Sequence, residues 1–357
     1  MAKTLMKGNE AVGAAAIAAG CIHFFGYPIT PQSEIPEYMA RELPKVGGVF
    51  TQAESEVAAI NMIYGAAGAG IRTMTTSSSP GVALMQEGIT YIAGAELPCL
   101  LVNMMRGGPG LGSIQPGQAD YFQATRGGGN GDYHVIVYAP ETIQEMCSLI
   151  QEGFDVADQY RNPVMIMSDG MLGQMMEPVD LQVEERRKLP EKTWAGSGTG
   201  GKRPPNIINS LFLDPNPLEQ HNIHLQKKYD EIKKNEVKVA SQGLDDAEVV
   251  FVAFGTVARI VKTAMKNLEA KGVKCGLIRP ITLWPFPTDE FKKINSGCKA
   301  VISVEESCGQ MVEDVRIALG DKFPIYFYGR AGGIIPTPEE IYDYTNDVLG
   351  GKANARF

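Results

Sequence analysis

Two glutamates stand at the start of a segment built largely from small residues, which runs from Gln52 to Gly68. Glu54 and Glu56 lie two residues apart, so on a helix they point to different faces, and one can be solvated while the other points inward. The alanines and glycines that follow allow the close approach of another backbone or of a flat ligand. Desolvation disfavours the charged form of a carboxyl beside such a surface, which is a condition for acid–base chemistry. The alternative is structural: both carboxylates stabilise the N-terminus of the helix.

A glycine-rich loop follows Arg106, with nine glycines between Gly107 and Gly131, counting both. The motif of a phosphate-binding P-loop is absent from the chain. The run from Gly107 to Gly112 follows an expected strand, but more loop comes after it instead of the helix that a dinucleotide site needs. The sequence therefore gives only weak support for a nucleotide site, and the alternative is that residues 107–131 form a mobile surface loop without a function. Because loops of this length inside a domain are usually functional, we favour a functional loop.

A third reading of the same loop is a thiamine diphosphate motif. Gly131, Asp132 and Tyr133 precede Asn162 at a distance similar to that between the diphosphate-binding Gly-Asp-Gly and its asparagine. Tyrosine replaces the last glycine, so we interpret this as a chance match. The chain is not expected to hold a diphosphate by itself.

Composition narrows the function classes further. The 357 residues carry 33 basic and 41 acidic side chains, a net charge of −8 that argues against electrostatic binding of nucleic acid. Six cysteines are scattered, with no CxxC pair, so neither a disulfide scaffold nor a local zinc or iron–sulfur motif is expected. We see no secretion signal and no apolar run of membrane-spanning length, and we expect a cytoplasmic protein without a membrane partner.

Short apolar strands alternate with helices in two regions, which predicts an α/β fold of two doubly wound domains. The first domain is expected over residues 1–185, a linker with an exposed helix over 186–244, and a second domain over 245–357. Within the first domain, Thr30 before Pro31 and Ser79 before Pro80 each have the pattern of a helix N-cap followed by proline. Capping alone would explain the Ser79 hydroxyl, whereas the Thr30 hydroxyl could cap a helix and also line a site.

Four segments in this order resemble the α subunits of 2-oxoacid:ferredoxin oxidoreductases. They are Tyr27–Pro31, Gln52–Glu56, Thr75–Gly81 and Met105–Pro109, and Val304–Gln310 extends the resemblance to the second domain. Within the family the chain looks most like the enzymes that act on 3-methyl-2-oxobutanoate, and the 2-oxoglutarate enzymes are close relatives. The resemblance implies a pyrimidine-binding domain for thiamine diphosphate, followed by a domain like the C-terminal domain of transketolases.

The resemblance also implies cofactors and partners. Thiamine diphosphate with Mg²⁺ would be held mainly by a β subunit, and the iron–sulfur clusters would lie on other subunits, among them γ and a ferredoxin-like δ. The substrates would be a 2-oxoacid and CoA, and the products acyl-CoA, CO2 and reduced ferredoxin. No metal ligand is implied for this chain itself.

The same resemblance implies roles for individual residues. Glu56, nine residues before Gly65 as in the family, would share a proton with the aminopyrimidine ring of the cofactor. Arg106 would recognise the 2-oxoacid, for which its planar fork is suited, unless it is an ordinary surface arginine. Thr30 would lie near substrate and cofactor, and Ser79 is a weaker candidate for cofactor binding.

Three other functions remain open from the sequence. A thiamine enzyme without redox partners would be active with a β subunit alone and would not depend on ferredoxin. A structural or regulatory subunit would carry a degenerate site. A nucleotide-binding protein would use the glycine-rich loop and would bind labelled nucleotide at equilibrium.

Overall fold

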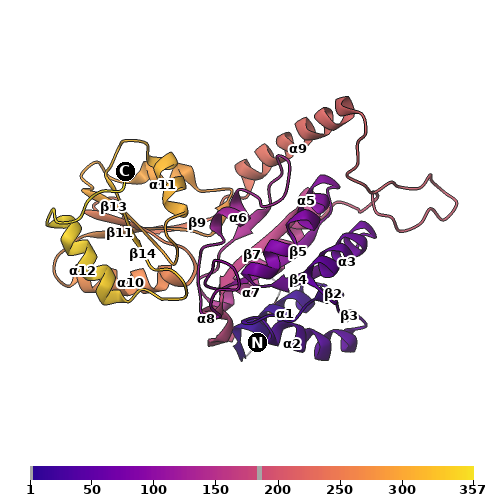
Figure 1. The fold of residues 1–357 in the computed structure, drawn as a ribbon, viewed down its shortest axis with the longest axis horizontal. Coiled ribbons are helices and arrows are strands. Elements are labelled where there is room, and N and C mark those ends of the chain that lie inside the picture. The colour runs from indigo at the N-terminus through magenta and orange to yellow at the C-terminus, as the bar shows by residue number, and fades with distance from the viewer. Residues whose placement is uncertain (1–2, 183–186) are drawn as a thin grey trace.

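The computed structural model describes residues 3–182 and 187–357, which form two large β-sheets surrounded by helices, and one two-stranded sheet (Figure 1). The first sheet has seven strands in the order β12-β6-β7-β5-β4-β2-β3, and the second has five in the order β14-β13-β10-β11-β9. Neighbouring strands are parallel except for β12 with β6 and β9 with β11, which are antiparallel. The predicted α/β architecture of two doubly wound domains is confirmed.

The strands of the first sheet are β2 (His23–Gly26), β3 (Val49–Gln52), β4 (Thr73–Ser77), β5 (Cys99–Met105), β6 (Ile136–Tyr138), β7 (Pro163–Asp169) and β12 (Thr282–Trp284). The helices of this part are α1 (Gly8–Ala18), α2 (Glu34–Glu42), η1 (Leu43–Val46), α3 (Glu56–Gly68), α4 (Ser79–Leu84), α5 (Gln86–Gly94), α6 (Tyr121–Thr125), α7 (Ile143–Tyr160), α8 (Gly170–Gln174) and α9 (Pro215–Asn235). A separate antiparallel pair joins β1 (Thr4–Lys7) to β8 (Met176–Val179).

The second sheet consists of β9 (Val239–Gln242), β10 (Val249–Val252), β11 (Cys275–Pro280), β13 (Ala300–Glu305) and β14 (Ile325–Gly329). Its helices are α10 (Gly255–Glu269), η2 (Thr288–Lys293), α11 (Met311–Leu319) and α12 (Pro338–Leu349). None of the helices in residues 3–182 and 187–357 combines the length and the apolar character of a membrane-spanning segment.

Burial explains why the central strands are apolar along their whole length. All seven residues of β5 are buried, and so are all seven of β7. Because successive side chains of a strand point to opposite faces, both faces of the sheet must be covered. Two groups of helices provide the cover: α1 packs against α2 and α7, and α3 packs against α4 and α5.

Two strands cross the ranges expected for the domains. Strand β9 lies within the expected linker but belongs to the second sheet, and β12 lies within the range of the second domain but pairs with β6 of the first. Residues 183–186, at the expected start of the linker, lie outside the described residues. We therefore propose a first domain over residues 1–185, a linker over 186–244 and a second domain over 245–357. In this division the linker contributes β9 to the second sheet, and the second domain contributes β12 to the first sheet.

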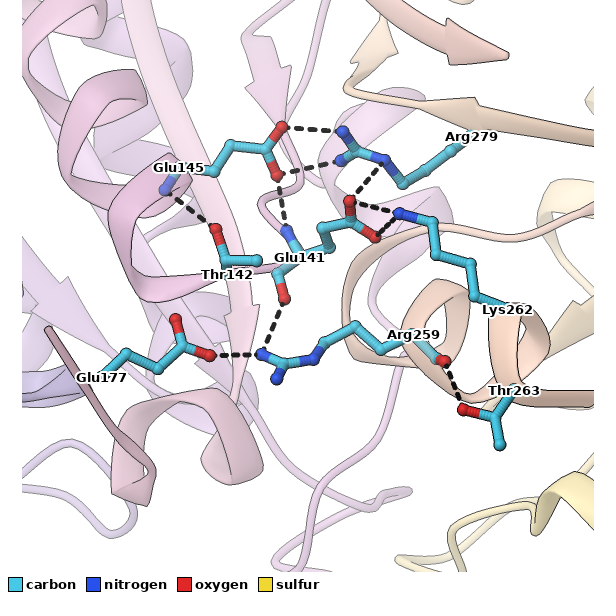
Figure 2. A network of polar contacts seen from close by, with 8 residues as sticks. All are labelled: Glu141, Thr142, Glu145, Glu177, Arg259, Lys262, Thr263 and Arg279. Carbon is cyan, nitrogen blue, oxygen red and sulfur yellow. Dashed lines mark hydrogen bonds and ion pairs between the residues drawn. The ribbon is translucent and has the colours of Figure 1, made fainter. Parts of the chain in front are cut away.

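A network of ion pairs joins the two domains on one side of their contact (Figure 2). The pairs are Glu145–Arg279 at 2.8 Å, Glu141–Lys262 at 2.6 Å and Glu177–Arg259 at 2.6 Å. The side chain of Arg279 is only 5% exposed, so its paired charges are shielded from solvent and from salt. This ion-pair network fixes α10 and β11 of the second domain against the start of α7 and against β8.

Candidate active site

The candidate residues gather at one edge of the first sheet, where its parallel strands end. Thr30 follows β2, Glu56 follows β3, Ser79 follows β4 and Arg106 follows β5. Strand β3 lies on one side of β2 and β4 on the other, so the chain reverses its direction across the sheet between β2 and β4. Ligands of open α/β sheets bind outside the carboxyl ends of the strands at such a switch point.

Glu56 points inward while Glu54 is exposed. Glu56 is 5% exposed and stands in the first turn of α3. The helix begins later than expected because Ser55 caps it, accepting a hydrogen bond from the amide of Ala58 at 3.2 Å. Glu54 therefore precedes the helix instead of lying on a second helical face. Among the described residues the Glu56 carboxyl has no hydrogen-bond partner, and it is free to bind a ligand.

Gly81 makes room for that carboxyl. A Cβ atom at this position would overlap with the Glu56 Oε1 and with the Ser77 Oγ, so the two side chains converge on the first turn of α4. The Ser77 and Ser78 hydroxyls are buried without a partner in the described structure. A buried cavity of about 10 Å³ beside Thr75, Ser77 and other residues has space for one water molecule at most. The Glu56 carboxyl, which has no partner in the described structure, is available to exchange a proton with a group placed against it.

Arg106 is a buried cation without a carboxylate partner in the described structure. Arg106 as a whole residue is only 7% exposed. The Nη1 donates to the Thr30 carbonyl at 2.9 Å and the Nη2 donates to the Leu111 carbonyl at 2.8 Å, whereas the Nε has no partner. Neutral carbonyls do not neutralise a guanidinium, so a buried arginine in this setting favours binding of an anion such as a carboxylate.

Ser79 does not cap a helix, which corrects the prediction for this hydroxyl. Ser78 holds the N-cap position of α4, and its side chain makes no capping hydrogen bond either. The Ser79 hydroxyl donates to the Asp120 Oδ2 at 2.6 Å and accepts from the Arg106 amide at 3.0 Å. Ser79 therefore fixes the main chain of Arg106.

Thr30 does not cap a helix either. Helix α2 begins at Glu34, four residues after Thr30, with Ser33 at the N-cap position. Instead Thr30 is exposed and borders a cavity of about 480 Å³ between the strand ends and the second domain. The cavity is lined by Thr30, Pro31, Ile114, Gln115, Pro116, Gly170, Met171, Gln174 and Ile335. A cavity of this size matches the usual volume of a small-molecule site.

Sequence reasoning missed the carboxyl group of Asp120. It accepts hydrogen bonds from the Ser79 hydroxyl at 2.6 Å and from the side-chain Nδ2 of Asn103 at 2.8 Å. Burial raises the pKa of Asp120, although those two hydrogen bonds act in the opposite direction. An acidic residue inside a glycine-rich loop has no spacing signal, so only the tertiary structure identifies it.

Two further carboxyl groups that sequence reasoning missed, those of Asp169 and Glu306, lie where the domains meet. Asp169 ends β7 and accepts a hydrogen bond from the Thr256 hydroxyl of the second domain. Glu306 is 2% exposed, and neither of its carboxyl oxygens has a partner in the described structure. Burial, and after it the nearby charge of Asp169, raises the pKa of Glu306 to about 9. Glu306 is thus protonated at neutral pH.

Family models match both parts of the chain. One described as "Pyruvate flavodoxin/ferredoxin oxidoreductase, thiamine diP-bdg" matches residues 14–241. Another described as "Pyruvate:ferredoxin oxidoreductase core domain II" matches residues 247–341.

Full-length relatives agree with these models. The ketoisovalerate oxidoreductase subunit VorB of Methanothermobacter thermautotrophicus is 47% identical, covering 99% of this chain and 100% of its own. The 2-oxoglutarate synthase subunit KorA of Methanocaldococcus jannaschii is 38% identical, covering 94% of this chain and 97% of its own.

Solved structures agree as well. The 2-oxoglutarate:ferredoxin oxidoreductase of Magnetococcus marinus, with 2-oxoglutarate, coenzyme A and succinyl-CoA bound, has a TM-score of 0.87 and 31% identity. The match covers 97% of this chain but 65% of that longer one. A split-gene transketolase, with a TM-score of 0.60 and 15% identity, shares the fold.

Proposed function

The chain belongs to the family of 2-oxoacid:ferredoxin oxidoreductases, and from this premise we propose that it is a catalytic subunit acting on 3-methyl-2-oxobutanoate. The reaction is the oxidative decarboxylation of that branched-chain 2-oxoacid with CoA to acyl-CoA, CO2 and reduced ferredoxin. The observation that carries the proposal is the buried Arg106, which has no carboxylate partner among the described residues and lies at the same sheet edge as Glu56.

Arg106 is proposed to bind the carboxylate of the 2-oxoacid. Its bonds to the carbonyls of Thr30 and Leu111 hold the guanidinium in place and leave N–H groups for a further acceptor. A carboxylate beside this plane would complete a charge-assisted pair in a site with little access to water. Thr30 at the border of the 480 Å³ cavity is proposed to contact substrate and cofactor.

Glu56 is proposed to exchange a proton with the cofactor. When bound, thiamine diphosphate supplies the nucleophilic carbon and the electron sink that decarboxylation of a 2-oxoacid requires. The Glu56 carboxyl, desolvated and without a partner in the described structure, would hold or release a proton at a ring nitrogen placed against it. Gly81 leaves room for the Glu56 carboxyl, and Ser79 is proposed to support the site through the Arg106 main chain.

The relatives carry subunit names, so this chain works with partner subunits. We propose that a β subunit holds the diphosphate and Mg²⁺, and that γ and a ferredoxin-like δ subunit carry the iron–sulfur clusters that pass electrons to ferredoxin. We also propose a cytoplasmic location. A preference for 2-oxoglutarate is the second candidate, because relatives with that activity in their names are 38% identical.

The test is to purify the chain with its co-purifying subunits and to measure CoA-dependent dye reduction with 3-methyl-2-oxobutanoate, 2-oxoglutarate and pyruvate. We expect the highest kcat/KM with 3-methyl-2-oxobutanoate. A preference for either other acid would contradict the proposed substrate. Turnover by this chain and a β subunit alone, without an electron acceptor, would indicate a thiamine enzyme of the non-redox kind.

A further inference from the structure

The glycine-rich loop is bonded to the second domain over residues 118–126. The Tyr121 hydroxyl donates to the Asp314 Oδ2 at 2.6 Å. The Gln310 side chain accepts from the Phe122 amide at 2.7 Å and donates to the Ala119 carbonyl at 2.7 Å. We call these contacts of Tyr121 and Gln310 the loop clamp. Both partners of the clamp in the second domain, Gln310 and Asp314, lie at the start of α11.

A second set of hydrogen bonds fixes the same loop at Gln118, just before the residues of the loop clamp. The Gln118 amide donates to the Glu306 carbonyl at 2.8 Å, and its side chain donates to the Phe254 carbonyl at 3.0 Å. The Glu306 amide in turn donates to the Gln118 Oε1 at 3.2 Å. Gln118 is fully buried, so these bonds are shielded from water.

The second domain holds the start of α11, which carries the clamp residues, in a fixed position. Glu305 is fully buried and accepts hydrogen bonds from the amides of Gln310 at 2.9 Å, Met311 at 3.0 Å and Val312 at 2.9 Å. Its carboxylate thus satisfies the free amides at the N-terminus of α11, where negative charge is also favoured. Gln310 and Asp314 are therefore presented to the loop from a fixed helix end.

The clamped loop reaches Arg106 by two routes. Asp120 lies between Gln118 and Tyr121, and it is bonded to Ser79, which accepts from the Arg106 amide. Leu111, further back in the loop, accepts from the Arg106 guanidinium at 2.8 Å. Both the main chain and the side chain of Arg106 thus depend on a loop that the second domain holds.

We propose that Tyr121 and Gln310 are positioning residues, which hold the loop so that Arg106 keeps the geometry for binding the 2-oxoacid carboxylate. This inference rests on the proposed function of Arg106. It gives the second domain a part in substrate affinity, although none of its clamp residues contacts Arg106 in the described structure.

Tyr121→Phe tests the clamp with little change in packing. It removes only the hydroxyl, while the ring stays against Phe254, whose ring centroid is 5.9 Å away. Asp314 keeps its hydrogen bond from Arg126 at 3.1 Å, so no buried charge is left alone. In the purified complex we expect the KM for 3-methyl-2-oxobutanoate to rise about tenfold, the usual size for a lost hydrogen bond to a charged group. The KM for CoA should stay unchanged.

Lys262→Gln is the matched control. It breaks an interdomain ion pair with Glu141 in the ion-pair network of Figure 2, away from the loop. We expect no change in either KM. Hydrogen–deuterium exchange of residues 107–126 should rise in Tyr121→Phe and stay at the wild-type level in Lys262→Gln, because only the first releases the loop.

The outcomes separate the two proposals. If the wild-type complex turns over the 2-oxoacid and Tyr121→Phe leaves the KM unchanged, the positioning role is wrong and the proposed function stands. An equal rise of KM in both variants also overturns the positioning role, because domain orientation would then be the cause. A wild-type complex inactive with every 2-oxoacid overturns the proposed function and this inference with it.

Discussion

The guanidinium of Arg106 donates a hydrogen bond to the main-chain carbonyl of Thr30 at 2.9 Å. These residues follow β5 and β2, which are not neighbours, since β4 lies between them in the sheet. The bond therefore spans the end of β4, on which Ser77 lies beside the Glu56 carboxyl. A single arginine thus connects the strand ends on either side of the carboxyl that we propose for proton exchange.

Arg106→Lys should separate charge from geometry. Lysine keeps the positive charge but loses the planar fork, so it cannot bond both carbonyls and a carboxylate together. We expect the KM for the 2-oxoacid to rise by about 10- to 100-fold, with a smaller change in kcat, in steady-state assays of the purified complex. The exposed Arg41→Lys serves as control and should leave both constants unchanged. A wild-type KM in Arg106→Lys would remove the arginine from substrate binding.

Gly81→Ala should disable the site through Glu56. The added Cβ would overlap with the carboxyl of Glu56 and the hydroxyl of Ser77, so one of them must move. We expect turnover to fall at least about tenfold, because misplacing a catalytic group by about 1 Å is costly. Gly65→Ala, on α3 with no atom of the described chain within 4 Å of its added Cβ, should instead raise the stability of the isolated chain by up to about 1 kcal/mol.

Two measurements decide that prediction: turnover of the Gly81→Ala complex and the thermal unfolding midpoint of each variant chain. Full activity of the Gly81→Ala complex would contradict the prediction. It would mean that the Glu56 carboxyl works normally despite the overlap with the added methyl group.

Local patterns predicted the outline of this site. The motifs Tyr27–Pro31, Gln52–Glu56 and Met105–Pro109 resemble the family, and that resemblance implied the roles of Thr30, Glu56 and Arg106. The spacing of Glu54 and Glu56 left open which of them points inward, and the family's spacing to Gly65 selected Glu56. These assignments depend on residues close together in the sequence, which a motif can identify without knowledge of the fold.

Contacts between distant segments could not be predicted. Ser79 has the pattern of a helix cap, but its partner Asp120 is 41 residues away, and a hydroxyl–carboxylate bond of 2.6 Å replaces the capping bond. Strand β12 is three residues long, and its pairing with β6 of the other domain leaves no periodic signal. Tertiary contacts override a local preference at both places.

The buried Glu306 should make stability depend on pH in one direction. The native chain keeps a proton up to about pH 9 that the unfolded chain releases near 4.5. Unfolding therefore releases a proton in this interval, and the free energy of unfolding falls as the pH rises from 4.5 to about 9. Glu306→Gln keeps the shape and stays neutral, so it should lose this dependence and exceed the wild type in stability at pH 9.

Urea unfolding of the chain at pH 6, 7.5 and 9 measures the difference. The exposed Glu339→Gln is the control and should show the wild-type dependence on pH. An identical dependence in Glu306→Gln and wild type would mean that Glu306 is ionised in the folded chain.

The most direct measurement compares Glu56→Gln with Glu54→Gln in the reconstituted complex, by CoA-dependent dye reduction with 3-methyl-2-oxobutanoate. Glutamine keeps the size of the side chain but cannot exchange a proton, so Glu56→Gln should lower turnover at least about 100-fold. The exposed Glu54→Gln should keep wild-type turnover. Both variants should assemble and unfold like the wild type. Full turnover in Glu56→Gln would contradict the account and make this chain a structural subunit.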